Sequence, residues 1–175
     1  MNIFVTSPLV SRCAQDLDDL RLRKMIVETA QMAATALRVK YGIETQYKST
    51  HTNHPCNKWA RETDVNLNWL LGLGISMCAE YRYRFGKVHK TQAVINDQMI
   101  AFYANPGINL AGEQTPFQNS ARNSVFDFTG IPVPYSYKAY LIAKWTVDKK
   151  EPKWTRRGPP SWAKVTWQGS KTGVQ

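Results

Sequence analysis

Apolar side chains recur at helical spacing through the longest patterned stretch of the chain, from Asp19 to Tyr41. Residues three or four positions apart lie on the same face of an α-helix, so this spacing predicts an amphipathic helix. Asp18 or Asp19 can cap its start, and Gly42 suits the capping position after its end. The apolar face comprises Leu22, Met25, Ile26, Ala30, Ala33 and Leu37. The pattern therefore predicts a long central helix with one face toward the core.

Similar spacing predicts four further helices. The first follows Ser7-Pro8, where a capping hydroxyl precedes a proline whose missing N–H is not needed at that position. The other three are expected to run from Thr63 or Asp64 to Phe85, from Thr91 to Tyr103 and from Ser136 to Val147.

The remaining segments are polar or short. Residues 43–61 are dense in groups that donate, accept or titrate, and residues 108–131 are rich in Gly, Asn, Pro and Ser. Both are expected to form loops. Asn2 to Val5 is short and apolar, which is consistent with a buried lead-in or a short strand. The expected fold is mainly α, a compact single domain of about five helices with long irregular loops and a basic-aromatic C-terminal tail.

Composition adds a strong positive charge. Lys and Arg number 23 against 13 Asp and Glu, which gives a formal net charge of +10. Such a charge favours a polyanionic partner, with nucleic acid ahead of an anionic membrane surface. The tail interleaves Trp154, Trp162 and Trp167 with basic residues, and Gly158-Pro-Pro160 disfavours helix there. Tryptophans in such a tail can stack on unpaired bases or can cover the core.

Cysteine usage and hydropathy bear on location. Cys13, Cys56 and Cys78 cannot all pair and show no CxxC spacing, which favours a reducing compartment. No signal pattern and no apolar run of membrane-spanning length is present. We therefore expect a cytoplasmic protein with no membrane partner, and we favour a monomer.

Polar residues line the other face of the predicted central helix. Arg21, Lys24, Glu28, Gln31 and Thr35 follow one another at offsets of three or four, so their side chains lie along one line. One interpretation is a solvated face with a Lys24–Glu28 pair worth roughly 0.3 kcal/mol. The other is a pocket wall, in which the Lys24 amine acts as a nucleophile and the Glu28 carboxylate stabilises a developing cation or moves protons.

Two histidines stand out in the loop of residues 43–61. His51 and His54 are three positions apart and Cys56 follows, but loop spacing of this kind is weak evidence for a metal ion, so no metal or other cofactor is expected. The histidines are better interpreted as phosphate or base contacts, or as acid–base groups near neutral pH. A purely structural role in a hydrogen-bonded loop is an equally good interpretation of either one.

Three stretches resemble a known family. They are Asn2-Ile-Phe-Val5 leading into Cys13 to Arg21, the predicted helix and turn from Leu70 to Thr91, and Glu151-Pro-Lys-Trp154 after a late helix. The chain resembles the small phage pyrimidine-dimer DNA glycosylases of the endonuclease V type and a related group of phage proteins. The related group is also similar at Asp18-Asp19, Lys24-Met25, Glu28 to Gln31, His54-Pro55 and Thr115 to Phe117.

The resemblance implies a compact all-α fold, DNA kinking, extrusion of a nucleotide, N-glycosidic cleavage and strand nicking. It also implies a chain-terminal amine as nucleophile, which here belongs to Met1 if the initiator is retained before Asn2. The assisting glutamate of the family aligns with Lys24, and the nearest carboxylate downstream is that of Glu28, one helical turn further on.

We therefore expect residues 1–150 to form a helical catalytic and DNA-binding domain and residues 151–175 a basic, tryptophan-rich tail. The candidate catalytic residues are Met1, Lys24, Glu28 and His54. The candidate DNA-binding residues are Asp19, Arg21, Arg23, Gln31, His51, Lys58, Arg61, Lys87, His89, Lys90, Trp154, Arg156 and Arg157.

Three functions are consistent with these residues. The leading hypothesis is a DNA glycosylase with AP lyase activity on damaged or modified pyrimidines. A second is a phage enzyme that uses the same pocket to modify a nucleotide or base, or to counter host defence. The third is a DNA- or RNA-binding protein without catalysis, in which the polar line on the central helix is simply solvated.

Overall fold

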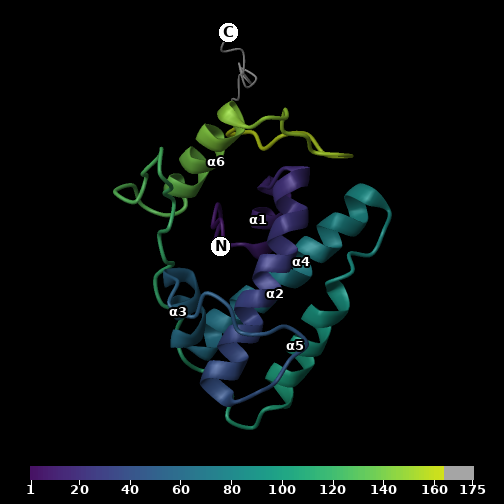
Figure 1. Ribbon diagram of the computed structural model, residues 1–175, viewed down its shortest axis with the longest axis vertical. Coiled ribbons are helices and arrows are strands. Elements are labelled where there is room, and N and C mark those ends of the chain that lie inside the picture. The colour runs from purple at the N-terminus through teal and green to yellow at the C-terminus, as the bar shows by residue number, and fades with distance from the viewer. Residues whose placement is uncertain (164–175) are drawn as a thin grey trace.

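The computed structural model describes residues 1–163, and helices are the only repeating secondary structure in that range. The helices are α1 (Val10–Asp16), α2 (Asp19–Tyr41), α3 (Pro55–Glu62), α4 (Asp64–Phe85), α5 (Gln92–Ala104) and α6 (Tyr135–Val147). Helix α2 packs against α3, α4 and α5, and α1 packs against α4. Figure 1 shows α2 and α4 in the middle of the molecule, with α6 at the opposite end from α5. The expectation of a compact, mainly α fold is confirmed.

Helix α2 has the predicted extent. The Asp18 side chain accepts hydrogen bonds from the backbone N–H groups of Leu20 and Arg21, and Gly42 ends the helix at a φ of 69°. A positive φ is costly for residues with a Cβ atom, which explains the glycine at this position. Every residue of the predicted apolar face is buried. Helix α2 is therefore the central element of the core.

A glycine allows helix α4 to approach two neighbours closely. A Cβ atom on Gly74 would lie 3.2 Å from Ile95 Cδ1 and 3.3 Å from Thr29 Cγ2. Both distances are shorter than an ordinary contact between carbon atoms. The glycine is thus explained by contact with α2 and α5 rather than by a turn.

Two helix boundaries differ from the expectation. Helix α1 begins at Val10, so Leu9 rather than Ser7 occupies the capping position, and no side chain caps the helix. Within residues 43–61, expected to be a loop, Pro55–Glu62 form α3. The His54 side chain accepts a hydrogen bond from the N–H of Cys56, and Pro55 occupies the first turn, where its missing N–H is tolerated. Because the segment is mostly polar, its short apolar face, which includes buried Trp59, did not predict a helix.

The N-terminal segment is buried beneath α6 and the irregular segment before it. Asn2 to Thr6 are all buried, and they form a lead-in rather than a strand. The Phe4 ring packs edge-on against Tyr137 of α6, with the ring centroids 6.0 Å apart. In Figure 1 the N-terminus lies inside the molecule, between α6 and α2.

Residues 148–163 fold back against α1 and the start of α2. Trp145 of α6 lies between two tail rings, with Trp154 edge-on at 5.0 Å and Trp162 stacked at 5.7 Å between centroids. The indole N–H groups of Trp154 and Trp162 donate to the backbone oxygen and the carboxylate of Asp16. This part of the tail covers the core. The expected Trp167 contact lies outside the described residues, and the domain division after residue 150 stays a prediction.

The break between α1 and α2 is held by one buried arginine. Arg84 of α4 is buried and donates to the backbone oxygens of Gln15 and Leu17, at 2.9 and 2.8 Å. Its guanidinium also binds the carboxylates of Glu80 at 2.7 Å and Asp19 at 3.1 Å. A buried cation is tolerated only when it is paired and hydrogen-bonded in this way.

We predict that Arg84→Lys destabilises the fold by about 3 kcal/mol. Lysine keeps the charge but cannot reproduce the planar fork that reaches four acceptors. Urea unfolding measures the loss, and Arg82→Lys, at an exposed position on the same helix, is the matched control. Equal free energies of unfolding for the two variants would show that the network does not stabilise the break.

Candidate active site

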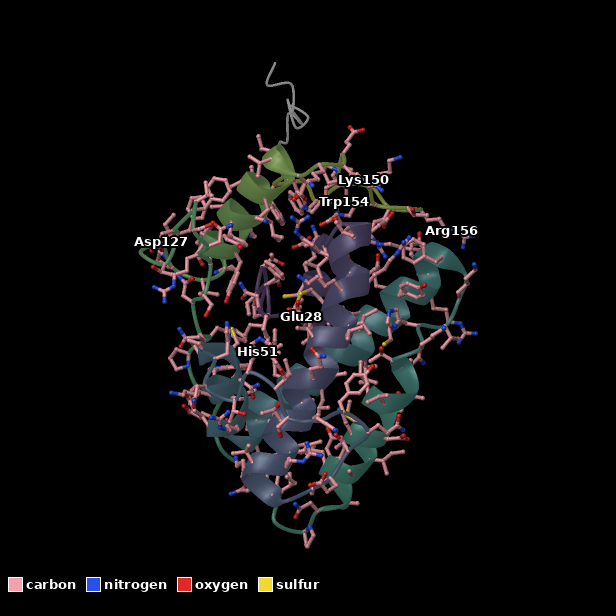
Figure 2. All side chains as sticks on the ribbon, viewed as in Figure 1. Glu28, His51, Asp127, Lys150, Trp154 and Arg156 are labelled. Carbon is pink, nitrogen blue, oxygen red and sulfur yellow. The ribbon has the colours of Figure 1, made fainter. Side chains whose placement is uncertain are left out.

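A cavity of about 380 Å³ opens between the N-terminal segment, α2 and α6. Its lining comprises Met1, Asn2, Phe4, Leu20, Arg21, Lys24, Met25, Glu28, Arg122, Tyr140, Lys144 and Asp148. Three of the four predicted catalytic residues therefore meet in one hollow. Figure 2 shows Glu28 in the middle of the molecule, between His51 and the end that carries Lys150 and Trp154.

Two amines meet the Glu28 carboxylate. The amino-terminal nitrogen of Met1 lies 3.5 Å from Oε2, and Lys24 Nζ lies 3.3 Å from Oε1. The side chains differ in exposure, at 2% for Met1, 14% for Glu28 and 72% for Lys24. The polar line on α2 is therefore solvated at Lys24 and forms a cavity wall at Glu28.

The hydrogen bonds of Asn2 place the amine of Met1. The Asn2 side-chain amide donates to the backbone oxygen of Ser120 at 3.0 Å, and its oxygen accepts from the N–H of Ile3 at 2.9 Å. Buried Ile3 and Val5 anchor the following residues in the core. The backbone is thus fixed immediately after Met1, which leaves the amine facing Glu28.

His54 lies close to this pair without lining the cavity. Burial lowers the pKa of the His54 imidazole, and repulsion by the Met1 amino group and by His51 lowers it further, whereas Glu28 raises it. Its Nδ1 accepts the N–H of Cys56 at 3.2 Å, so a neutral ring caps α3. Because Nδ1 is the acceptor, the neutral ring carries its proton on Nε2 and can donate a hydrogen bond there, and the acid–base role expected from the sequence stays a prediction.

Some predicted DNA-binding residues are occupied by structural contacts. Arg21 is buried, and its Nη1 lies 3.0 Å from Asp18 and 2.7 Å from Asp148. Asp19 binds Arg84 and accepts from the Thr155 hydroxyl at 2.7 Å. Arg21 lines the cavity but is held between α2 and the residue after α6, and Asp19 attaches the tail to α2.

The predicted tail contacts are likewise engaged within the fold. Arg157 binds the Glu80 carboxylate at 2.6 and 2.8 Å and lies over the Tyr83 ring. Arg156 donates to the Tyr83 backbone oxygen. Together with Trp154, which packs on Trp145, these residues hold the tail against α4 and α6. None of the three lines the cavity.

The other predicted DNA-binding residues lie outside the cavity. Exposed or partly exposed side chains are those of Arg23, Gln31, His51, Lys58, Arg61, Lys87, His89 and Lys90. Arg23 lies over the Phe85 ring at 4.5 Å, and burial lowers the pKa of His89, whose ring meets Tyr81 edge-on. Contact of this set with DNA stays a prediction.

Two basic residues that line the cavity were not predicted from the sequence. Arg122 comes from the irregular segment before α6, and Lys144 from the last turn of α6. Neither belongs to a motif, and their approach to Glu28 depends on how α6 folds over the N-terminus. The only available signal was the excess of positive charge. Within residues 1–163, no group of three or more His, Cys, Asp or Glu side chains is arranged to hold a metal ion.

Comparison with known protein families gives a match. A family model described as pyrimidine dimer DNA glycosylase matches residues 1–93, just over half of the chain. This range contains Met1, Lys24, Glu28 and His54, whereas Arg122 and Lys144 lie beyond it. No curated protein and no solved structure matches the chain. None of the helices within residues 1–163 is long and apolar enough to cross a membrane.

We predict that His54 makes the fold less stable in acid. Its folded-state pKa is lowered, so the unfolded chain takes up a proton first as the pH falls through about 6.5, and stability falls with it. His54→Asn retains a capping side chain but does not titrate. Urea midpoints at about pH 7.5 and about pH 5.5 should therefore differ less in His54→Asn than in the unsubstituted protein. Equal differences in the two proteins would contradict this role.

Proposed function

The chain belongs to the pyrimidine dimer DNA glycosylase family, and we propose that it cleaves the N-glycosidic bond of damaged or modified pyrimidine nucleotides in DNA. We also propose that it then nicks the strand through an imine intermediate. Met1 supplies the nucleophilic amine and Glu28 the assisting carboxylate. DNA is the partner that the family implies and that the net charge of +10 favours.

One observation carries the proposal: the Met1 amine lies 3.5 Å from Glu28 Oε2 in an open cavity. A nucleophile beside a carboxylate is the arrangement that covalent catalysis on a sugar requires. The carboxylate can take a proton from the amine and can stabilise positive charge on the sugar. The buried Asn2 anchor holds the two groups together before any substrate binds.

The chemistry proceeds in two stages. First, the Met1 nitrogen attacks C1′ and gives a proton to Glu28, and the C1′–N1 bond breaks with its electron pair leaving on the base, which takes up a proton from solvent. The C1′–O4′ bond then opens, O4′ takes up the proton from Glu28, and a protonated imine links Met1 to C1′.

In the second stage, Glu28 accepts a proton from C2′. The electrons form a C1′–C2′ enamine that expels the 3′ phosphate as the C3′–O3′ bond breaks. Water then hydrolyses the imine and restores the amine of Met1. No oxidant, reductant or metal ion takes part in these steps.

Met1 is a better candidate than Lys24 for the nucleophile. The Lys24 side chain is 72% exposed, whereas that of Met1 is 2% exposed. Lys24 is then a cation beside the carboxylate, positioned to attract the backbone of the substrate.

The target nucleotide has to leave the base stack to reach the cavity, as enzymes acting on bases in duplex DNA require. Arg122 and Lys144 line the cavity with Lys24, and positive charge there suits the phosphates on either side of the extruded sugar. The exposed basic residues outside the cavity, such as Arg23, Lys58 and Lys87, are proposed to contact phosphates further along the strand.

We predict that Glu28→Gln lowers the rate of glycosidic cleavage at least about a hundredfold, because the amide cannot accept protons or stabilise the cation. The measurement is mass spectrometry of the cleaved strands of an oligonucleotide with a pyrimidine dimer, in which the freed base stays joined to its neighbour, combined with borohydride trapping of the imine. Glu113→Gln, at an exposed position outside the cavity, should keep the full rate.

The same measurement separates the alternatives. Undiminished glycosidic cleavage by Glu28→Gln would contradict the mechanism. A nucleoside that gains mass in a strand that stays uncleaved would contradict the glycosylase and favour group transfer to the base.

A further inference from the structure

A short hairpin outside the range that the family model matches borders the candidate active site. Residues 121–128 turn back on themselves in the irregular segment before α6, and Arg122 lies opposite Asp127 in an antiparallel bridge. Arg122 also lines the cavity that contains Glu28. Figure 2 shows Asp127 at the edge of the molecule, where this segment projects past α6. The hairpin therefore connects the cavity wall with the outer surface.

Hydrogen bonds hold the hairpin in one shape. The N–H of Phe128 donates to the backbone oxygen of Ala121 at 2.9 Å. At the tip, the side-chain oxygen of Asn123 accepts the N–H groups of Val125 and Phe126 at 2.8 and 2.7 Å. Asparagine commonly closes turns in this way. The rings of Phe126 and Phe128 stack with their centroids 6.3 Å apart. The tip is therefore a defined turn.

The base of the hairpin shares its anchor with the Met1 amine. Ser120 precedes the hairpin, and its backbone oxygen accepts the side-chain amide of Asn2 at 3.0 Å. The N–H of Ser120 donates to the Tyr137 hydroxyl of α6 at 3.1 Å. Because Asn2 also places the amine, the hairpin and the proposed nucleophile are fixed relative to each other.

The tip of the hairpin exposes an apolar side chain. Val125 is 76% exposed, the highest value for a large apolar residue within residues 1–163. Isolated exposed apolar residues are common on protein surfaces, and exposure alone would carry nothing. Here the side chain extends from a defined turn, on the same hairpin as a cation that lines the cavity. The carboxylate of the hairpin is engaged, since Asp127 accepts the N–H and the hydroxyl of Thr129 at 2.9 and 2.6 Å.

The length of the hairpin limits how far its tip reaches. Val125 follows Arg122 by three positions, and an extended strand rises about 3.3 Å per residue, so their Cα atoms lie at most about 10 Å apart. Nucleotides along one strand of DNA are spaced by about 3.4 Å. The tip therefore falls within about three base pairs of DNA that contacts Arg122, close beside the reacting sugar.

We propose that residues 121–128 bind the duplex beside the nucleotide whose sugar reaches Glu28, with Arg122 on a phosphate and Val125 against sugars and base edges in the groove. The inference rests on the proposed function, since it takes DNA as the substrate. Contacts to phosphate fix the register of a protein on DNA, and both two-stranded ribbons and apolar side chains enter DNA grooves. The hairpin is a positioning element that sets the register of the duplex against the cavity and does not touch the reacting atoms.

Disulfide cross-linking to a duplex with a thiol-tethered base tests where the tip lies. The native cysteines are buried, so Val125→Cys adds a single exposed thiol. Val39→Cys, at a position on α2 that is 50% exposed, is the matched control. Both proteins also carry Glu28→Gln, so that the strand stays intact. For Val125→Cys we expect an adduct when the tether lies about three base pairs from the dimer on one side, and none at about ten base pairs.

Three results of the cross-linking would overturn the proposal. The first is an equal yield of adduct at the near and the far tether, and the second is an equal yield for Val39→Cys. The third is a disulfide-linked protein dimer in place of the DNA adduct, which would assign the tip to contact with a second copy of the chain.

A second readout compares glycosidic cleavage of two dimer-containing duplexes, one with long flanks and one that ends just past the dimer on the contacted side. For Val125→Ser we expect kcat/KM to fall about fivefold on the long duplex, because an apolar contact is lost. On the short duplex the variant should match the unsubstituted protein, since neither can make the contact there. Val39→Ser should leave cleavage of both duplexes unchanged.

An equal loss for Val125→Ser on both duplexes, or no loss on either, would contradict the role of the hairpin. If the unsubstituted protein cleaves neither duplex, the proposed function fails, while the cross-linking still tests whether the hairpin contacts DNA.

Discussion

The break between α1 and α2 is the constraint on which the other features depend. Arg84 reaches from α4 to two backbone oxygens at the end of α1 and to Asp19 at the start of α2. This fixes where α2 begins and therefore which residues its first turns direct toward α6. Glu28 and Leu20 take their places from that starting point. The same network includes Glu80, which binds Arg157, so the position of the tail depends on it as well.

The candidate active site also depends on a buried N-terminus. Charged amino termini usually remain in water, because burial of a charge is costly unless it is paired. Here Asn2 is held by the backbone of Ser120, and the Met1 amine faces Glu28 instead of solvent. The irregular segment and α6 complete this enclosure, although they lie outside the range that the family model matches. The proposed reacting groups thus lie within the matched range, and the rest of the chain shapes their surroundings.

Much of the fold was predictable because helical spacing and capping residues are local signals. The apolar face of α2, a cap at Asp18 or Asp19 and its end at Gly42 were all predicted from the sequence, and the structure places the cap at Asp18. Helix α3 was missed, because only a few apolar positions interrupt a polar stretch. Met1, Lys24 and Glu28 were proposed as site residues from the family resemblance and helical spacing, and their roles stay a prediction. Arg122 and Lys144 were not, since only the tertiary packing of α6 brings them to the cavity.

The central claim is that the Met1 amine forms the covalent bond to the sugar. The most direct measurement is peptide mapping of the adduct after borohydride reduction on dimer-containing DNA. Trypsin cleaves after Arg12 and so separates Met1 from Lys24. The account predicts the sugar on the N-terminal peptide, attached to the nitrogen of Met1. An adduct on Lys24, with an unmodified N-terminal peptide, would contradict it.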